Sequence, residues 1–212
     1  MNQHIDFKLY LITDRKLFDS IDALYKVVDE ALSAGVKALQ LREKDMMARE
    51  LLDIAYRLRD LTWRHQAKLF INDRLDIALS VRADGIHVGQ SGIPVRDLRR
   101  VAGKDFLIGY SAHSPEEAAK ADKEGADFIT FGPVFSTPSK MKYGSPVGLK
   151  SLREAAGKVG LPVFGIGGIK SINILDVISS GASGIALISG ILSAGEPAAA
   201  AREYLERVGE RQ

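Results

Sequence analysis

Short apolar runs alternate with longer segments of helical periodicity along the whole chain, and this alternation restricts the fold more than any other feature. Residues 8–13 form an apolar run with a β-branched member, which favours a strand. In the segment that follows, Ile21, Leu24, Val28 and Leu32 lie on one face of a helix. Further strands are predicted at residues 36–41, 68–71, 85–88, 106–109, 127–131, 162–166 and 184–188. Further helices are predicted at about 45–65, and at 75–80, 95–101, 115–124, 149–158, 172–179 and 197–208.

Glycine marks the return from helix to strand. Gly35, Gly85, Gly125 and Gly181 each stand where a helical period ends, so we expect them to take the left-handed conformation that closes a helix. Ser114 marks a helix start, because Pro and Glu follow it in the order typical of a capped first turn. Roughly eight strand–helix pairs predict an all-parallel sheet with helices outside it. Because no linker interrupts the alternation, we expect one domain over residues 1–212, an α/β chain folded as a single (βα)8 TIM barrel.

Composition excludes several functional classes. The 212 residues contain no cysteine, which excludes disulfides, thiol nucleophiles and thiolate metal sites. The net charge is +2 and no basic run stands out, so neither nucleic acid nor a membrane is an expected partner. The first residues lack the pattern of a signal peptide, and no apolar run approaches membrane-spanning length. We therefore expect a cytoplasmic protein.

Two glycine-rich stretches late in the chain predict a phosphate site. Residues 163–169 join an apolar strand to three glycines, and helical periodicity resumes near Ser171. Glycine lets the backbone approach a phosphate closely, and N–H groups at a helix start favour an anion. Residues 184–190 end in the same way, in Ser-Gly. One such stretch alone would suggest only a tight turn, whereas two neighbouring strand ends favour a phosphate site in a TIM barrel.

Polar residues follow the second and third predicted strands. Strand alternation directs Gln40, Arg42 and Lys44 to one side, into the mouth of the barrel. Arginine can donate two hydrogen bonds to one phosphate, and lysine supplies a point charge. Asp73 is suited to Mg²⁺, but the tripeptide around it favours a helix cap for the segment that starts near Leu75.

The later loops add histidines, hydroxyls and lysines. His87 lies inside a predicted strand, where a packed and hydrogen-bonded histidine is the favoured interpretation. His113 stands at the rim beside two serines, where proton transfer and simple solvation are equally supported. The loop at 132–144 carries hydroxyls and two lysines, of which Lys140 is the better anion ligand. Together these loops predict a site for two phosphate groups.

Several ordered motifs are similar to those of a known family. They are LYLITDR at 9–15, QLREK at 40–44, INDR at 71–74, DGIHVGQ at 84–90, GPVF at 132–135 with Thr137 and Lys140, and GIGGI at 165–169. Together they resemble the thiamine phosphate synthase family, which includes the thiazole tautomerases. The resemblance covers nearly the whole chain and implies a (βα)8 barrel.

The resemblance also implies roles for individual residues. The expected ligands of hydroxymethylpyrimidine diphosphate are Gln40, Arg42, Lys44, Asn72, Ser111 and Lys140. The expected ligands of the thiazole phosphate are Thr137, Ser139, Gly168, Ile188 and Ser189. Asp73 would hold Mg²⁺, and the residues implied to be catalytic are Lys140, Ser111 and Arg42, together with His113 as the acid or base of the tautomerases. In that family, pyrophosphate leaves a pyrimidine carbocation, which the thiazole nitrogen then attacks.

One departure leaves alternatives open. Synthases carry a second metal-binding aspartate where this chain has Gly92. A tautomerase that isomerises the thiazole carboxylate phosphate through His113 is therefore the second hypothesis, and a non-catalytic ligand-binding regulator is the third. The synthase is preferred because Lys44, Asp73 and Lys140 are retained. The partners expected are small phosphorylated pyrimidine and thiazole compounds, and a homo-oligomer is left open.

Overall fold

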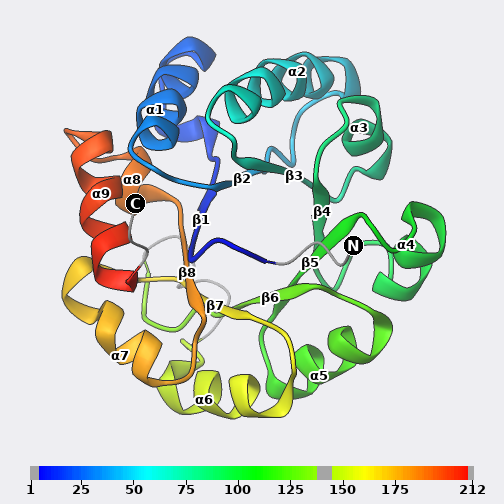
Figure 1. Ribbon diagram of the computed structural model, residues 1–212, viewed down its shortest axis with the longest axis vertical. Coiled ribbons are helices and arrows are strands. Elements are labelled where there is room, and N and C mark those ends of the chain that lie inside the picture. Colours follow the sequence, from blue (N-terminus) through cyan, green and yellow to red (C-terminus); the bar gives the residue numbers. More distant parts are fainter. Residues whose placement is uncertain (1–4, 138–144, 210–212) are drawn as a thin grey trace.

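The computed structural model describes residues 5–137 and 145–209 and forms a closed barrel of parallel strands (Figure 1). The strands follow chain order around the barrel, and β1 closes it by pairing with both β2 and β8. They are β1 (Leu9–Ile12), β2 (Ala38–Leu41), β3 (Lys68–Asn72), β4 (Gly85–Val88), β5 (Leu107–Ala112), β6 (Phe128–Phe131), β7 (Val163–Ile166) and β8 (Gly184–Leu187). The predicted (βα)8 barrel is confirmed.

Helices surround the sheet on its outer side, as Figure 1 shows. They are α1 (Ile21–Ser33), α2 (Ala48–Arg64), α3 (Leu75–Ser80), α4 (Val95–Ala102), α5 (Pro115–Glu124), α6 (Gly148–Lys158), α7 (Ile174–Ser179), α8 (Ser189–Leu192) and α9 (Pro197–Val208), with short 3-10 turns η1 (Arg15–Leu17) and η3 (Ser171–Asn173). Their apolar faces and the outward side chains of the strands form the larger hydrophobic core. No helix among the described residues is long and apolar enough to cross a membrane.

The inside of the barrel has an aromatic layer and a polar layer. Tyr10, Phe70, Phe128 and Phe164 point inward and contact one another edge to face or at a tilt, with Phe7 packed against all four. Because side chains alternate along a strand, the residues two positions further toward the strand ends also point inward. Counted also from Ala38, Gly85 and Gly109, which face the interior on three other strands, these positions hold Ile12, Gln40, Asn72, His87, Ser111, Thr130 and Ile166. The polar layer therefore lies directly above the aromatic layer.

The predicted role of glycine between helix and strand holds at three of the four positions. Gly35, Gly125 and Gly181 have positive φ, as expected. Gly85 does not, and the left-handed residue after α3 is Arg82, with φ 51°. A Cβ at Gly85 would lie 2.4 Å from the carbonyl oxygen of Leu107 and also meet the Phe70 ring. Gly85 is thus required by packing inside the barrel.

Candidate active site

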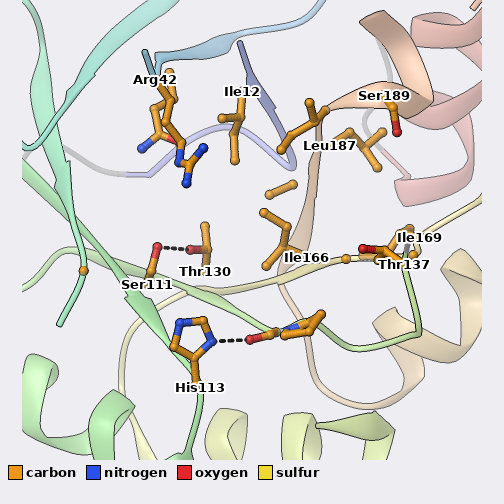
Figure 2. A pocket seen from close by; sticks show the side chains of 18 of the residues that line it. Ile12, Arg42, Ser111, His113, Thr130, Thr137, Ile166, Ile169, Leu187 and Ser189 are labelled. Atoms are coloured by element: carbon orange, nitrogen blue, oxygen red, sulfur yellow. Dashed lines mark hydrogen bonds between the residues drawn. The ribbon is translucent and has the colours of Figure 1, made fainter. Parts of the chain in front are cut away.

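A cavity of about 610 Å³ opens at the carboxyl ends of the strands, above the polar layer (Figure 2). It brings together the predicted substrate-binding, metal-binding and catalytic residues that lie in the described part of the chain. These are Gln40, Arg42, Lys44, Asn72, Asp73, Ser111, His113, Thr137, Gly168, Ile188 and Ser189. Ser139 and Lys140 lie outside the described residues, so their predicted roles remain predictions.

Arg42 is held by a buried network between the first two strand ends. Its backbone N–H donates to Thr13 Oγ1 at 2.9 Å, and the Thr13 hydroxyl donates to Glu43 Oε1, also at 2.9 Å. The same carboxylate oxygen accepts from the backbone N–H of Arg15 at 3.0 Å. Burial raises the pKa of Glu43, although these hydrogen bonds oppose the shift. Figure 2 shows the result, with the Arg42 guanidinium projecting into the cavity.

A row of amides leads from the second strand end to Asp73. Gln40 is buried, and its Nε2 donates to Asn72 Oδ1 at 3.4 Å. Asn72 Nδ2 in turn donates to Asp73 Oδ2 at 2.8 Å, and Lys44 Nζ lies 3.8 Å from the same oxygen. The predicted helix cap at Asp73 is wrong, because α3 begins after Arg74 and no side chain caps it. The Asp73 carboxylate faces the cavity instead.

The oxygen donors of the cavity decide whether the Mg²⁺ implied by the family resemblance fits this site. Asp73 is the only acidic residue among the described residues that line the cavity. No cluster of three or more metal-binding side chains occurs within residues 5–137 and 145–209. Mg²⁺ commonly uses one or two carboxylates together with phosphate oxygens and water. The donor set therefore fits Mg²⁺ bound mainly through a phosphorylated ligand.

Gly92 lies directly beside this carboxylate. A Cβ added at Gly92 would be 3.0 Å from Asp73 Oδ1 and 3.2 Å from the carbonyl oxygen of Gly89. Any side chain at this position would thus contact Asp73. The family pattern has a carboxylate at this position, where it could bind the same metal ion as Asp73. Gly92 removes that carboxylate.

Ser111 and Thr130 form the hydroxyl floor of the cavity. The two hydroxyls are 3.2 Å apart (Figure 2), and both contact Nε2 of the buried His87, at 2.9 Å from Ser111 and 3.3 Å from Thr130. The predicted packing role of His87 is confirmed, since it is 2% exposed and hydrogen bonded. Ser111 was expected in the loop after the fifth strand, but β5 extends to Ala112 and includes it. Burial, with a contribution from Arg42, lowers the pKa of His87 to about 3.

His113 stands at the rim of the cavity. Its Nδ1 is hydrogen bonded to the carbonyl oxygen of Gly132, as Figure 2 shows. Because a carbonyl only accepts, Nδ1 carries the proton and Nε2 is the ring nitrogen left for proton transfer. Its backbone N–H donates to Glu117 Oε2 at 2.8 Å. His113 thus ties the end of β5 to the end of β6.

The opposite wall is apolar and ends in the predicted glycine stretch. Ile12, Ile166, Ile169 and Leu187 line it (Figure 2). Gly168 has φ 66°, and a Cβ there would lie 2.7 Å from Phe135 Cβ. Only glycine therefore fits at this contact between the sixth and seventh strand ends.

The sequence analysis missed several polar residues that line the cavity. They are Gln90, Ser91, Thr130, Ser136, Lys170 and Tyr204. Thr130 lies two residues after the inward Phe128, so strand alternation could have identified it. Tyr204 comes from α9, the last helix, and no local pattern connects it with the strand ends.

The fold and the cavity define a class of protein first, a TIM-barrel enzyme with a site for phosphorylated ligands at the carboxyl ends of its strands. Comparison with known proteins narrows this class, because the family model for thiamine monophosphate synthase matches residues 9–191. The chain belongs to the thiamine monophosphate synthase family.

Individual relatives extend over nearly the full chain. A relative from Geobacter sulfurreducens is 50% identical over 201 residues, covering 95% of this chain and 94% of the relative. A thiamine-phosphate synthase from Clostridium acetobutylicum is 45% identical over 192 residues, covering 91% of this chain and 90% of the relative. The solved structure of a thiamine phosphate pyrophosphorylase from Pyrococcus furiosus has a TM-score of 0.87 at 38% identity, covering 96% of each chain. The recognised family resemblance is thereby confirmed.

Proposed function

We propose that this protein is a thiamine-phosphate synthase, a transferase that joins hydroxymethylpyrimidine diphosphate to a thiazole phosphate. The bond between the pyrimidine methylene carbon and the diphosphate oxygen breaks, and a bond from that carbon to the thiazole nitrogen forms. The products are thiamine phosphate and pyrophosphate. The observation that carries the proposal is the convergence of Arg42, Lys44 and Asp73 at one end of the cavity. Relatives named as thiamine-phosphate synthases support the same activity.

Arg42 and Lys44 bind the diphosphate and stabilise the charge that develops as it leaves. Arg42 supplies a planar pair of donors and Lys44 a point charge, and both reach the cavity. Gln40, Asn72 and Ser111 orient the pyrimidine side of the substrate. The fixed positions of these groups account for most of the rate acceleration, because the protein forms no covalent bond with the substrate.

Asp73 is the residue that would hold Mg²⁺ when the diphosphate substrate is bound. The metal ion would neutralise negative charge on the leaving group. The amide row from Gln40 through Asn72 to Asp73 sets the direction of the carboxylate. With one protein carboxylate, the ion would need further oxygen ligands from phosphate and water.

The thiazole phosphate binds at the seventh and eighth strand ends. Gly168 and Ser189 line this side of the cavity, and Thr137 and Ile188 lie beside them in the lining. The apolar wall of Ile12 and Ile166 accommodates the rings and excludes water from the reacting carbon.

The direct test is to incubate purified protein with both substrates and Mg²⁺ and to measure thiamine phosphate by thiochrome fluorescence. We expect Mg²⁺-dependent product, with Arg42→Ala and Lys140→Ala each reducing turnover by about a hundredfold or more. Arg100→Ala is the control, since this exposed arginine of α4 does not line the cavity. Folded protein without product would refute the proposal.

Isomerisation of the thiazole carboxylate phosphate by His113 is the competing activity. Its specific support is the position of His113 on the cavity rim with Nε2 available for proton transfer. The synthase names of the relatives favour the transferase. His113→Ala should therefore leave synthase turnover within a few-fold of the wild type. The same variant should abolish any isomerase activity.

A further inference from the structure

We propose that His87 is a positioning residue that makes the Ser111 hydroxyl a hydrogen-bond donor toward the ligand. It does so as the middle member of a directed hydrogen-bond chain, defined here as Tyr10, His87 and Ser111. His87 itself is outside the cavity lining, behind the hydroxyl floor. Its effect on a ligand therefore passes through Ser111.

The direction of the chain is set at Tyr10. This side chain is fully buried among phenylalanine rings, and the acceptor available to its hydroxyl in the described residues is His87 Nδ1, at 3.4 Å. A buried hydroxyl whose proton has no acceptor is costly. Tyr10 therefore donates, and Nδ1 of His87 must be the unprotonated ring nitrogen.

The second step assigns the proton of the imidazole. Burial and the nearby Arg42 lower the pKa of His87 to about 3, so the ring is neutral near pH 7. Its single proton then resides on Nε2, which donates to Ser111 Oγ at 2.9 Å. Ser111 accepts from the barrel interior and keeps its own hydrogen for a partner in the cavity or for Thr130, 3.2 Å away.

Close packing holds the imidazole of His87 in its place inside the barrel. Gly109 is paired with His87 across β4 and β5, and a Cβ there would lie 2.4 Å from His87 Nδ1. The Phe128 ring stands on the same side, with its centroid 5.6 Å from that of the imidazole. The glycine and the aromatic ring thus fix the plane of the imidazole, and its contacts with Tyr10 and Ser111 assign the two nitrogens.

The consequence for ligand binding rests on the proposed function. A hydroxyl that donates will select an acceptor atom, such as a diphosphate oxygen or an unprotonated pyrimidine nitrogen. The opposite tautomer would turn a lone pair of Ser111 toward the cavity and repel the same atoms. His87 thereby fixes the polarity of a substrate contact.

The first experiment measures the tautomer directly. In protein labelled with ¹⁵N-histidine, the four histidines of the chain give few signals, and His65→Gln and His113→Gln variants assign them. We expect His87 to carry its proton on Nε2 and to remain neutral from pH 8 to pH 5. His65, whose Nε2 lies 2.8 Å from Asp29 Oδ1 outside the barrel, supplies a reference signal. A proton on Nδ1, or an imidazolium at pH 5, would overturn the proposal.

The second experiment tests the coupling to Ser111. Tyr10→Phe removes only the hydroxyl that starts the chain, and we expect kcat/KM for the diphosphate substrate to fall about 3- to 10-fold. In a Ser111→Ala background the same change should have no further effect. Tyr25→Phe, on α1, is the matched control and should leave kcat/KM unchanged. Additive losses would overturn the coupling. Because the tautomer is measured without substrate, a protein that makes no thiamine phosphate refutes the proposed function and leaves the tautomer result intact.

Discussion

Asp73 shows how one residue combines strain with function. Its φ of 59° is in the left-handed region, which costs a non-glycine residue about 1 kcal/mol or more. The backbone N–H of Asp73 still donates to the carbonyl oxygen of His87 at 3.0 Å, so the sheet pairing holds it in place. The strain is consistent with a carboxylate that is aimed at the cavity for binding.

Gly92→Asp should convert this single carboxylate into a pair. Mn²⁺, a spectroscopic substitute for Mg²⁺, should bind the wild type weakly until inorganic pyrophosphate is added, because one carboxylate beside Lys44 attracts a free cation poorly. In the variant, we expect affinity for Mn²⁺ without pyrophosphate to rise about tenfold. Electron paramagnetic resonance detects free Mn²⁺, so a titration gives the Mn²⁺ affinity of the wild type and of the variant.

The control for this experiment is Gly92→Asn, which has nearly the same size and no charge. Both variants must displace the Asp73 carboxylate slightly, because a Cβ at this position lies 3.0 Å from its oxygen. Equal Mn²⁺ affinity in the two variants would show that the added charge does not reach the metal.

His87 should make the stability of the protein depend on pH below neutrality. A histidine whose folded pKa is lowered from 6.5 to about 3 contributes stability above its unfolded pKa, and this is lost as the pH falls toward the folded value. Between pH 7.5 and pH 5 the loss should be about 2 kcal/mol. Urea unfolding at both pH values, compared with His87→Gln, isolates this contribution. An equal pH dependence in the variant would contradict it.

At the scale of elements, two arginine–aspartate anchors connect helices to the amino-terminal side of the barrel. Arg59 of α2 donates to Asp84 Oδ2 at 2.6 Å, and that oxygen also accepts from the backbone N–H of Leu69 at 2.7 Å. Arg99 of α4 and Asp127 repeat the arrangement just before β6. Each anchor joins a helix, the entrance to a strand and the neighbouring strand, at the end of the barrel opposite the cavity.

Arg99→Met should destabilise the fold by about 2–4 kcal/mol. The change removes hydrogen bonds to the carbonyl oxygens of Gly103, Phe106 and Gly125 and leaves the Asp127 carboxylate without its cation. Urea unfolding should detect the loss at unchanged m-value. Arg100→Met, at the next and more exposed position of α4, should cost less than about 0.5 kcal/mol. Similar losses in the two variants would argue against the anchor.

Periodicity allowed most of the elements to be predicted, because each strand and helix is short and patterned locally. The bounds of α3, α5, α9 and β4 agree with the prediction. The four-residue α8 and the turn η1 were missed, since so short a helix has no complete apolar face. Gly85 was misassigned because its requirement comes from Phe70 on a neighbouring strand.

Part of the candidate site could be predicted from the rule that TIM-barrel active sites lie at the carboxyl ends of the strands. Residues just after the barrel strands lie at the end where the cavity opens, which accounts for Arg42, Asp73 and Ser189. Contacts made between distant segments could not be predicted in this way. The Glu43–Thr13 network and the approach of Tyr204 from α9 depend on how the strands are spaced around the closed barrel.

For the whole molecule, the barrel separates stability from activity along its axis. Phe7 precedes β1 and plugs the amino-terminal end, with ring centroids 5.2–6.0 Å from those of Tyr10, Phe70, Phe128 and Phe164. The cavity and its charged residues are at the other end, above the polar layer. A change at the plug should therefore affect folding more than catalysis.

Phe7→Ala should lower the free energy of unfolding by about 3–5 kcal/mol, because it leaves a cavity beneath a rigid ring layer that cannot collapse to fill it. Phe7→Leu, which keeps most of the volume, should cost less. At a temperature where both variants remain folded, kcat should stay near the wild-type value. Arg42→Ala should show the reverse, with turnover lost and unfolding hardly changed, since its side chain projects into the cavity. Paired urea unfolding and thiochrome assays on the three variants measure both quantities. A fully folded Phe7→Ala protein with reduced kcat would show that the aromatic layer transmits its packing to the site above.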